Sequence, residues 1–205
     1  MISRFLLSRV SFFLLFSLML ILNSCGGGGN DAPKPRGYFR FDFPKKAYTR
    51  FTSPGCPYSF EYPVYAKVVH DTSFFGAPTE DPCWLNVEIP ELSGIIHISY
   101  KEIKGGNTLE KLIEDAHALS YKHTVKADYI DETPINNPEH NVKGLIYEIG
   151  GNAASNIQFY LTDSSRNFIR GALYFSAPPN ADSLAPAVAF VRQDMIHLIN
   201  TLEWK

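Results

Sequence analysis

Apolar and polar residues alternate through much of the first half of the chain, and this period of two is typical of half-buried β-strands. In Cys83–Ile89, CWLNVEI, every second residue starting from Cys83 falls on one side of the predicted strand. Phe74–Pro82 interrupts the pattern with a glycine and two prolines, which predicts a loop. The strands predicted in this half are Tyr38–Phe43, Tyr58–Tyr62, Tyr65–His70, Cys83–Ile89 and Gly94–Ile103.

Two stretches change to the spacing of three and four that marks one face of a helix. The first has its apolar residues at Leu109, Leu112, Ile113, Ala116 and Leu119. Asn107 or Thr108 can cap its first turn, because a short side-chain oxygen accepts a free backbone N–H there. The second begins at Asp182 or Ser183, and its apolar stripe is wide enough to lie across a sheet. That stripe consists of Leu184, Val188, Val191, Met195, Leu198 and Leu202.

Strands return between the two predicted helices. Ala127–Thr133 precedes a polar loop, Pro134–Asn141. Three further strands then follow: Lys143–Gly151, Ser155–Asp163 and Phe168–Ser176. The turn DSSRN between the last two is short, which predicts antiparallel pairing and excludes a parallel, doubly wound sheet. We therefore predict a single α+β domain at 38–205, a sandwich-like antiparallel β-sheet covered by two helices. This layout resembles small Mog1/PsbP-like α/β sandwiches.

The N-terminus combines a basic start with a short apolar run, which is typical of a secretory signal. Arg4 and Arg9 supply the charge, and the apolar run Val10–Leu22 is shorter than the roughly 20 residues that span a bilayer. The sequence LNSC that ends at Cys25 is similar to a lipobox, the recognition site of bacterial lipoprotein signal peptidase. We predict a lipoprotein signal peptide at 1–24 and lipidation of Cys25. The alternative is an ordinary transmembrane start with a chance cysteine.

The composition of residues 25–37 predicts a flexible tether that begins with a lipidated Cys25. Gly26–Gly29 leave the backbone free, and the prolines of NDAPKPRG favour an extended chain. Acyl chains on Cys25 anchor durably, because each buried CH2 contributes about 0.8 kcal/mol. No acidic run follows Cys25, which favours the periplasmic side. We therefore expect a lipid-anchored protein of the cell envelope, in the outer membrane and facing the periplasm.

The net charge and the cysteines indicate which kinds of binding and cross-linking the chain supports. The formal charge of the 205 residues is −2, and loss of Arg4 and Arg9 with the signal makes it about −4. No run of five or more Lys or Arg occurs, so nucleic-acid binding has no electrostatic support. Cys56 and Cys83 form an even pair in a compartment that permits disulfides, which predicts a bridge between them. Two buried free thiols or metal ligation are the alternatives, and the absence of histidines at finger spacing argues against zinc.

The sequence contains no complete catalytic or metal-binding motif of the common kinds. His117 and His123 lie six residues apart, so they face different ways and cannot chelate one ion. His97 alternates with apolar neighbours and faces away from them. Gly150–Asn156 could cradle an anion, but it and Asp163–Ser165 are more typical of hairpin turns. We therefore predict that the protein is not an enzyme, has no catalytic residue and binds neither a cofactor nor a metal.

Two hypotheses concern binding surfaces. Tyrosine is common at interfaces because it combines a large contact area with one polar group, although core packing and strand propensity are the favoured explanation here. Four tyrosines lie near the tether in sequence: Tyr38, Tyr58, Tyr62 and Tyr65. A ligand pocket needs a concave apolar site with a few convergent polar groups. We place such a pocket around Trp84, His97 and Asn152.

Several long segments of the chain are specific enough to be compared with known families. Among them are PKPRGYFRFDFP, CPYSFEYP, EDAHALSYKHTVKAD and PNADSLAPAVAFVRQDMIHLINTLEWK. These segments resemble the gliding motility lipoprotein family GldD of Bacteroidota, in the same order and over nearly all of the mature chain. The resemblance implies a cell-envelope lipoprotein needed for gliding, with protein partners in the gliding and type IX secretion apparatus. It carries no catalytic residues, so it implies a scaffold or assembly factor. The alternative function is a periplasmic ligand-binding lipoprotein module.

Overall fold

The structure, a computed structural model, describes residues 42–71, 73–74, 77–78 and 81–205. The predicted signal peptide, Cys25 and the tether lie outside the described residues, as does most of the strand predicted at Tyr38–Phe43. Asp42 and Phe43, the last two residues of that stretch, are described and lie outside any strand.

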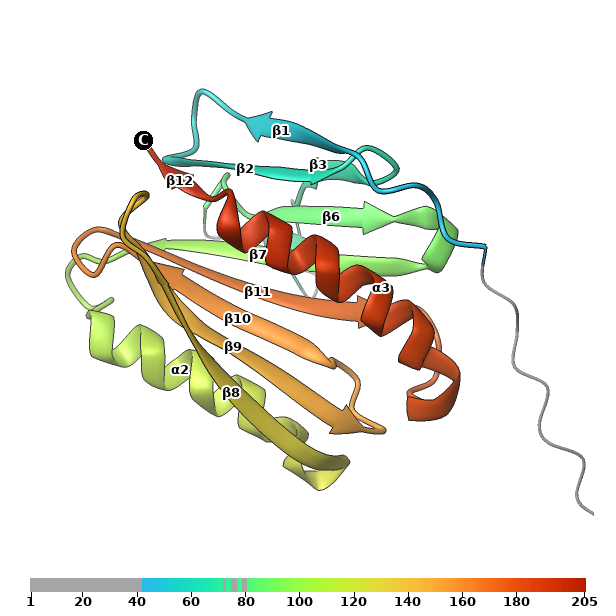
Figure 1. Ribbon diagram of the computed structural model, residues 1–205. Coiled ribbons are helices and arrows are strands. Elements are labelled where there is room, and N and C mark those ends of the chain that lie inside the picture. Colours follow the sequence, from blue (N-terminus) through green and yellow to red (C-terminus); the bar gives the residue numbers. More distant parts are fainter. Residues whose placement is uncertain (1–41, 72, 75–76, 79–80) are drawn as a thin grey trace, which may run out of the picture. The chain divides into compact units, whose positions relative to one another are not determined.

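Seven antiparallel strands form the main sheet (Figure 1). Every pair of neighbours in it is antiparallel, as the short turns predicted. In order across the sheet, the strands are β3 (Lys67–His70), β6 (Leu85–Ile89), β7 (Gly94–Glu102), β11 (Asn167–Phe175), β10 (Ile157–Thr162), β9 (Val142–Gly151) and β8 (Ala127–Asn137).

A smaller, three-stranded sheet joins distant parts of the chain. In it, β2 (Tyr58–Pro63) lies between β1 (Tyr48–Thr52) and β12 (Glu203–Trp204). Two short strands, β4 (Ser73–Phe74) and β5 (Ala77–Pro78), pair with each other. The two α-helices of the described residues are α2 (Leu109–Tyr121) and α3 (Ala181–Asn200). A 3-10 helix, η2 (Lys122–Val125), continues α2. Another 3-10 helix, η1 (Pro90–Leu92), links β6 to β7.

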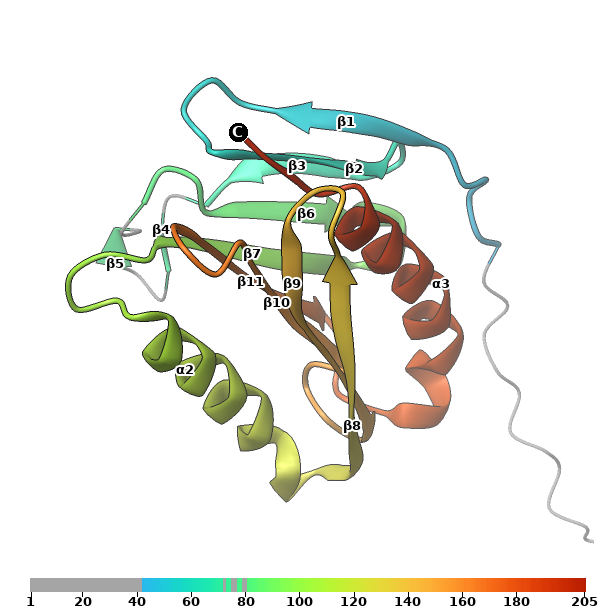
Figure 2. The same ribbon diagram turned by 60° about the vertical axis from the view of Figure 1, so that its left-hand side comes forward.

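The main sheet carries one helix on each face (Figure 2). On one face, alternate strand residues pack against α3 and the small sheet; Phe159 of β10 and Met195 of α3 are fully buried there. On the other face, Leu112 and Ala116 of α2 pack on Phe168 of β11. This is the α+β architecture that the alternation of apolar and polar residues predicted.

Both helices begin at a side-chain cap. Thr108 caps α2, as predicted, and accepts a hydrogen bond from the backbone N–H of Lys111 at 3.3 Å. The cap of α3 is Asn180, whose Oδ1 accepts from the N–H of Ser183 at 3.0 Å. The predicted start at Asp182 or Ser183 was therefore late, because Asn180, Asp182 and Ser183 can all cap and sequence alone does not rank them.

The polar loop predicted at Pro134–Asn141 is wrong in its first half. β8 continues to Asn137, with Pro134 opposite Leu145 of β9. A proline is tolerated there because β8 is an edge strand, which needs ladder hydrogen bonds on one side only. Residues 65–66, predicted as the start of a strand, instead form a turn before β3.

Candidate functional site

Asp194 of α3 is 1% exposed, and a buried carboxylate is costly unless it is paired and hydrogen-bonded. The Nζ atom of Lys46 lies 2.7 Å from its Oδ1 and also donates to the carbonyl of Phe190 at 2.7 Å. The Tyr48 hydroxyl donates to the same Oδ1 at 3.0 Å, and the Tyr65 hydroxyl donates to Oδ2. Donors from two separate segments thus meet on one carboxylate. We call Lys46, Tyr48, Tyr65 and Asp194 the Asp194 cluster.

The two tyrosines of the cluster are held in their protonated form. Burial, followed by the hydrogen bond to Asp194 and by its negative charge, raises the pKa of Tyr48 to about 12. Burial and Asp194 also raise the pKa of Tyr65. The protonated hydroxyl is the form that donates, so both tyrosines keep their bonds to Asp194 at neutral pH.

Ring stacking continues the contact between the N-terminal segment and α3. The Tyr48 ring stacks on His197, with ring centroids 3.6 Å apart, and Nε2 of His197 lies 2.7 Å from Oε2 of Glu61. Phe43 stacks on Phe190 with centroids 4.4 Å apart. The chain that follows the predicted tether is therefore fixed along α3 by one ion pair and two stacked ring pairs.

A cavity of about 420 Å³ lies on the opposite face of the main sheet, between the strands and α2; we call it the α2 cavity. Leu112 and Leu119 of α2 line it on the apolar side. His97 and Ser99 of β7 and Arg170 of β11 line it on the sheet side. Small-ligand sites have volumes of roughly 300–1,000 Å³. The α2 cavity has the size and the mixed lining of such a site.

Two polar groups of the α2 cavity, His97 and Arg170, have lowered pKa values. Burial lowers the pKa of His97, and Nδ1 of that ring lies 2.6 Å from Oδ1 of Asn86. A neutral imidazole donates there through Nδ1–H and leaves Nε2 as an acceptor. Burial also lowers the pKa of Arg170, but a guanidinium stays charged in proteins. The site therefore presents a fixed cation beside a neutral imidazole.

The pocket predicted from sequence is right for two of its three residues. Trp84 and His97 both line the α2 cavity. Asn152 lies elsewhere: its Oδ1 accepts from the backbone N–H of Ala181 at 2.9 Å, at the start of α3. Sequence reasoning missed Arg170, although a single charge within the apolar strand sequence FIRGALYF was a visible signal.

The tyrosines near the predicted tether, for which core packing was favoured over an exposed interface, are buried or half-buried where the structure describes them. Tyr58 is 0% exposed and donates to the carbonyl of Cys83 at 2.5 Å. Tyr62 and Tyr65 pack against the main core, and Tyr38 lies outside the described residues. The reason is that β2 is the middle strand of the small sheet and lies under α3.

Cys56 and Cys83 are joined by a disulfide, with Cα atoms 5.4 Å apart. The bridge connects the residues just before β2 to those just before β6, and both cysteines are buried. Cys25, the predicted lipidation site, lies outside the described residues.

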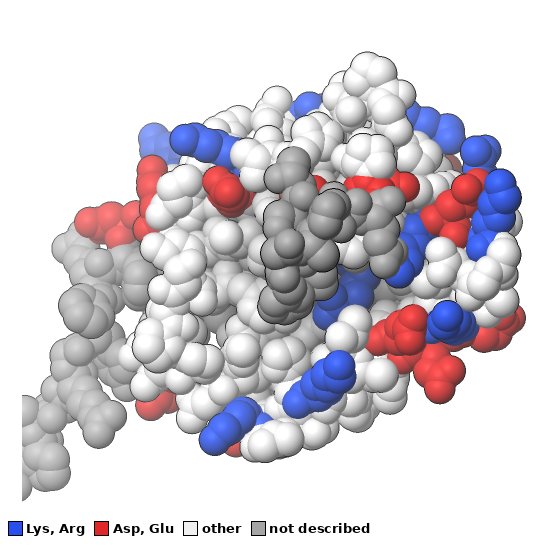
Figure 3. Space-filling view, turned by 180° about the vertical axis from the view of Figure 1, so that it is seen from behind, with Lys and Arg blue, Asp and Glu red and all other residues white. Residues whose placement is uncertain are grey.

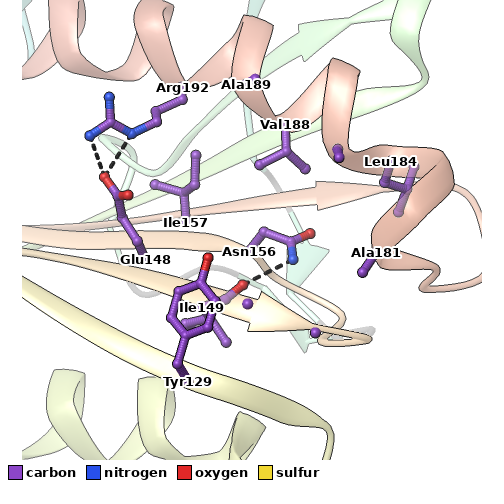
Figure 4. Close-up of a pocket in the computed structure, with 13 residues that line it drawn as sticks. Tyr129, Glu148, Ile149, Asn156, Ile157, Ala181, Leu184, Val188, Ala189 and Arg192 are labelled. Atoms are coloured by element: carbon purple, nitrogen blue, oxygen red, sulfur yellow. Dashed lines mark hydrogen bonds and ion pairs between the residues drawn. The ribbon is translucent and has the colours of Figure 1, made fainter.

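A smaller hollow of about 260 Å³ lies between α3 and the strands β8 to β10 (Figure 4). Nε of Arg192 donates to Oε1 of Glu148 at 2.7 Å across it. Nδ2 of Asn156 donates to the carbonyl of Ile149 at 3.0 Å and so closes the loop Gly150–Asn156. The polar groups of this hollow are thus paired with one another, and the loop joins β9 to β10 as a hairpin.

The remaining candidate residues have local structural contacts. His117 stacks on Tyr121 with centroids 4.1 Å apart, whereas His123 lines a separate hollow beside Asn152. Oδ1 of Asp163 accepts three backbone N–H groups in the turn between β10 and β11. Burial raises the pKa of Asp163, but these hydrogen bonds outweigh it and leave the pKa below its usual value.

The part of the chain that the structure describes has neither a metal-binding group of side chains nor a membrane-spanning helix. No three or more His, Cys, Asp or Glu side chains are grouped there so that they could hold a metal ion. None of the helices in the described ranges has the length and apolar character needed to span a bilayer.

Comparisons with known proteins identify the family. No curated protein matches the sequence. The chain is similar to the solution structure of cyanobacterial PsbP (CyanoP) from Synechocystis sp. PCC 6803, with 14% identity and a TM-score of 0.47 over 90% of this chain and 99% of that one. A family model described as gliding motility lipoprotein GldD matches residues 28–204. The chain therefore belongs to the gliding motility lipoprotein GldD family, whose members are lipid-anchored proteins of the cell envelope.

Proposed function

We propose that this lipoprotein is a non-enzymatic scaffold or assembly factor of the gliding and type IX secretion apparatus. In this proposal, lipid on Cys25 holds it in the outer membrane, facing the periplasm. Family membership supports the link to gliding and the lipid anchor. The observation that carries the scaffold role is the distribution of exposed apolar side chains.

Five large apolar side chains of the described residues are exposed, and four of them lie within 119–129. Val125 is 83% exposed and Tyr129 is 56% exposed. The other two are Leu119 and Tyr121. Leu119 lines the α2 cavity and Tyr129 lines the hollow beside α3, so the four side chains follow one another along the chain from one face of the main sheet to the other. Exposed apolar groups that are near one another are typical of protein contact sites. The end of α2, η2 and the start of β8 are therefore the proposed contact region.

The contact region and the first strand lie at opposite ends of the described fold. The junction of α2 and β8 is at the bottom of Figures 1 and 2, whereas β1 is at the top. The Asp194 cluster fixes residues 46 and 48 to α3. A domain that is held at one end presents its other end to a partner, as a tethered scaffold requires.

Site-specific photo-crosslinking in living cells tests this function. We would place a photoreactive phenylalanine analogue at Val125, and at Val64 as the control, because Val64 is the fifth exposed apolar residue and lies outside the contact region. The expected result is a light-dependent adduct with an identified gliding or secretion component at Val125 and not at Val64. Equal adducts at Val125 and Val64 would contradict the scaffold role. The absence of an adduct at Val125, and at Tyr129 when the same analogue is placed there, would also contradict it.

A ligand-binding module is the second candidate function, and the α2 cavity favours it. Trp84 and His97, predicted from sequence as pocket residues, lie together in its lining. Thermal unfolding of the lipidated protein with a panel of envelope metabolites and peptides tests this candidate. A dose-dependent rise in Tm supports it, and an unchanged Tm across the panel counts against it.

A further inference from the structure

Arg170 stands in the middle of the main sheet and faces the α2 cavity. It lies opposite Ser99 of β7 and Tyr160 of β10. Its neighbour Ile169 faces the main core, and the ring of Phe159 covers Gly171 on that same face. Successive residues of a strand point to opposite faces, so Arg170 points toward α2 and into the cavity.

Among the described residues, no carboxylate pairs with the charge of Arg170. Its polar partners, Gln158 and Tyr174, are neutral. Its Nε atom is buried and lacks a hydrogen-bond acceptor among the described residues. Within the described ranges, no Asp or Glu oxygen lies within 4.0 Å of the guanidinium. The residue as a whole is half-buried, and partial burial of an unpaired cation is costly, so a group that supplies an anion at this place would bind favourably.

Among the described residues that line the cavity, the formal charges other than that of Arg170 cancel. Two cations, Lys101 and Lys122, stand against two anions, Asp71 and Asp115, so Arg170 leaves an excess of one positive charge. Figure 3 views this side of the molecule and shows basic side chains near the middle of the face. The lining also has an apolar part, which includes Leu112 of α2 and Phe168 of β11. A ligand that matches the site has one negative charge and an apolar body.

We propose that the α2 cavity binds a small organic carboxylate. The carboxylate would accept hydrogen bonds from the Arg170 guanidinium, whose fork matches its two oxygens. The apolar part would lie against Leu112 and Phe168. This proposal specifies the ligand of the second candidate function and does not depend on the scaffold role, because crosslinking at Val125 and ligand binding are separate measurements.

Titration calorimetry of the lipidated protein in detergent tests the proposal with benzoate as the probe. Benzamide has the same shape without the charge, and inorganic phosphate has the charge without the apolar body. We expect heat of binding for benzoate alone. In Arg170→Met, which keeps the aliphatic stem, the affinity should fall about tenfold or more, because hydrogen bonds to charged groups are lost. Arg192→Met removes an exposed arginine from the other face and should bind benzoate as the unsubstituted protein does.

Stability measurements separate a ligand site from a structural arginine. Removing a half-buried cation that has no carboxylate partner among the described residues should leave the Tm of ligand-free Arg170→Met unchanged or higher. Equal binding of benzamide and benzoate, binding of phosphate alone, or unaltered benzoate binding by Arg170→Met would overturn the proposal. If Arg170→Met does not fold, Ser99→Leu fills the cavity and leaves the guanidinium in place. Benzoate binding that survives Ser99→Leu would also overturn the proposal.

Discussion

The Nζ atom of Lys46 lies 2.7 Å from Oδ1 of Asp194, although 148 residues separate the two in sequence. Lys46 belongs to the segment that follows the predicted tether in sequence, and Asp194 belongs to α3, the longest helix of the described residues. The side chain of Asp194 is 0% exposed and that of Lys46 is 24% exposed. The ion pair thus joins the N-terminal part of the described chain to the core.

Asp194→Ala should lower the free energy of unfolding by about 3 kcal/mol, because it leaves the half-buried ammonium of Lys46 and the hydroxyls of Tyr48 and Tyr65 without their acceptor. Urea denaturation at pH 7 measures this. Glu148→Ala is the matched control: it breaks the exposed pair with Arg192 and should cost about 1 kcal/mol or less. Equal costs for the two substitutions would show that the Asp194 cluster has no special role in stability.

Stability should fall as the pH rises from 10 to 12. The pKa of Tyr48 is raised from 10.0 to about 12 in the folded state, so in this window the unfolded chain releases the tyrosine proton first. The stabilising contribution is complete below pH 10 and is lost as pH approaches 12. Denaturation across this range should show a shallower loss for Tyr48→Phe. Exposed Tyr129→Phe is the control, and an identical slope in both variants would refute the assignment.

Loss of the Cys56–Cys83 disulfide should lower the free energy of unfolding by roughly 3.5 kcal/mol, from the entropy of an open loop in the unfolded state. The double substitution to Ser, compared with the oxidised protein in a urea titration, measures this. Mass spectrometry of non-reduced peptides verifies the bridge itself. Recovery of both thiols free, from protein purified without reductant, would disprove it.

Gly144→Ala should destabilise the protein by about 1–3 kcal/mol, because a Cβ there would collide with the backbone carbonyl of Tyr160 on the adjacent strand. The control is Gly106→Ala, where a Cβ would meet nothing within 4 Å. Thermal unfolding of both variants decides the matter. A Tm for Gly144→Ala equal to that of Gly106→Ala would mean that β9 and β10 adjust without strain.

Cys25→Ala should leave the precursor uncleaved and abolish function in the cell. The thiol is the only atom that can take the lipid in the predicted site, and the anchor depends on buried acyl chains. Membrane fractionation and colony spreading measure the two effects. Normal fractionation together with normal motility would contradict lipidation at this residue.

The sequence predicted the sheet well because the pattern that reveals a strand is local. Ile157 to Leu161 alternate between the two faces of β10, and that alternation is visible in the sequence. The Asp194 cluster could not be predicted, because its residues come together only after the small sheet forms. The same holds for β12, whose two residues are too few to show a period. Asn152 was misplaced because the loop that carries it folds toward α3 rather than toward Trp84.

The small sheet also has a kinetic consequence. Ser59 of β2 pairs with Thr52 of β1, a few residues away, and with Glu203 of β12, which lies near residue 205. Loops of such unequal length close at very different rates. During export, the hairpin of β1 and β2 would form early and wait with one open edge until β12 arrives. The small sheet would then be the last part of the domain to be completed, which gives folding helpers a defined period in which to bind the unfinished edge.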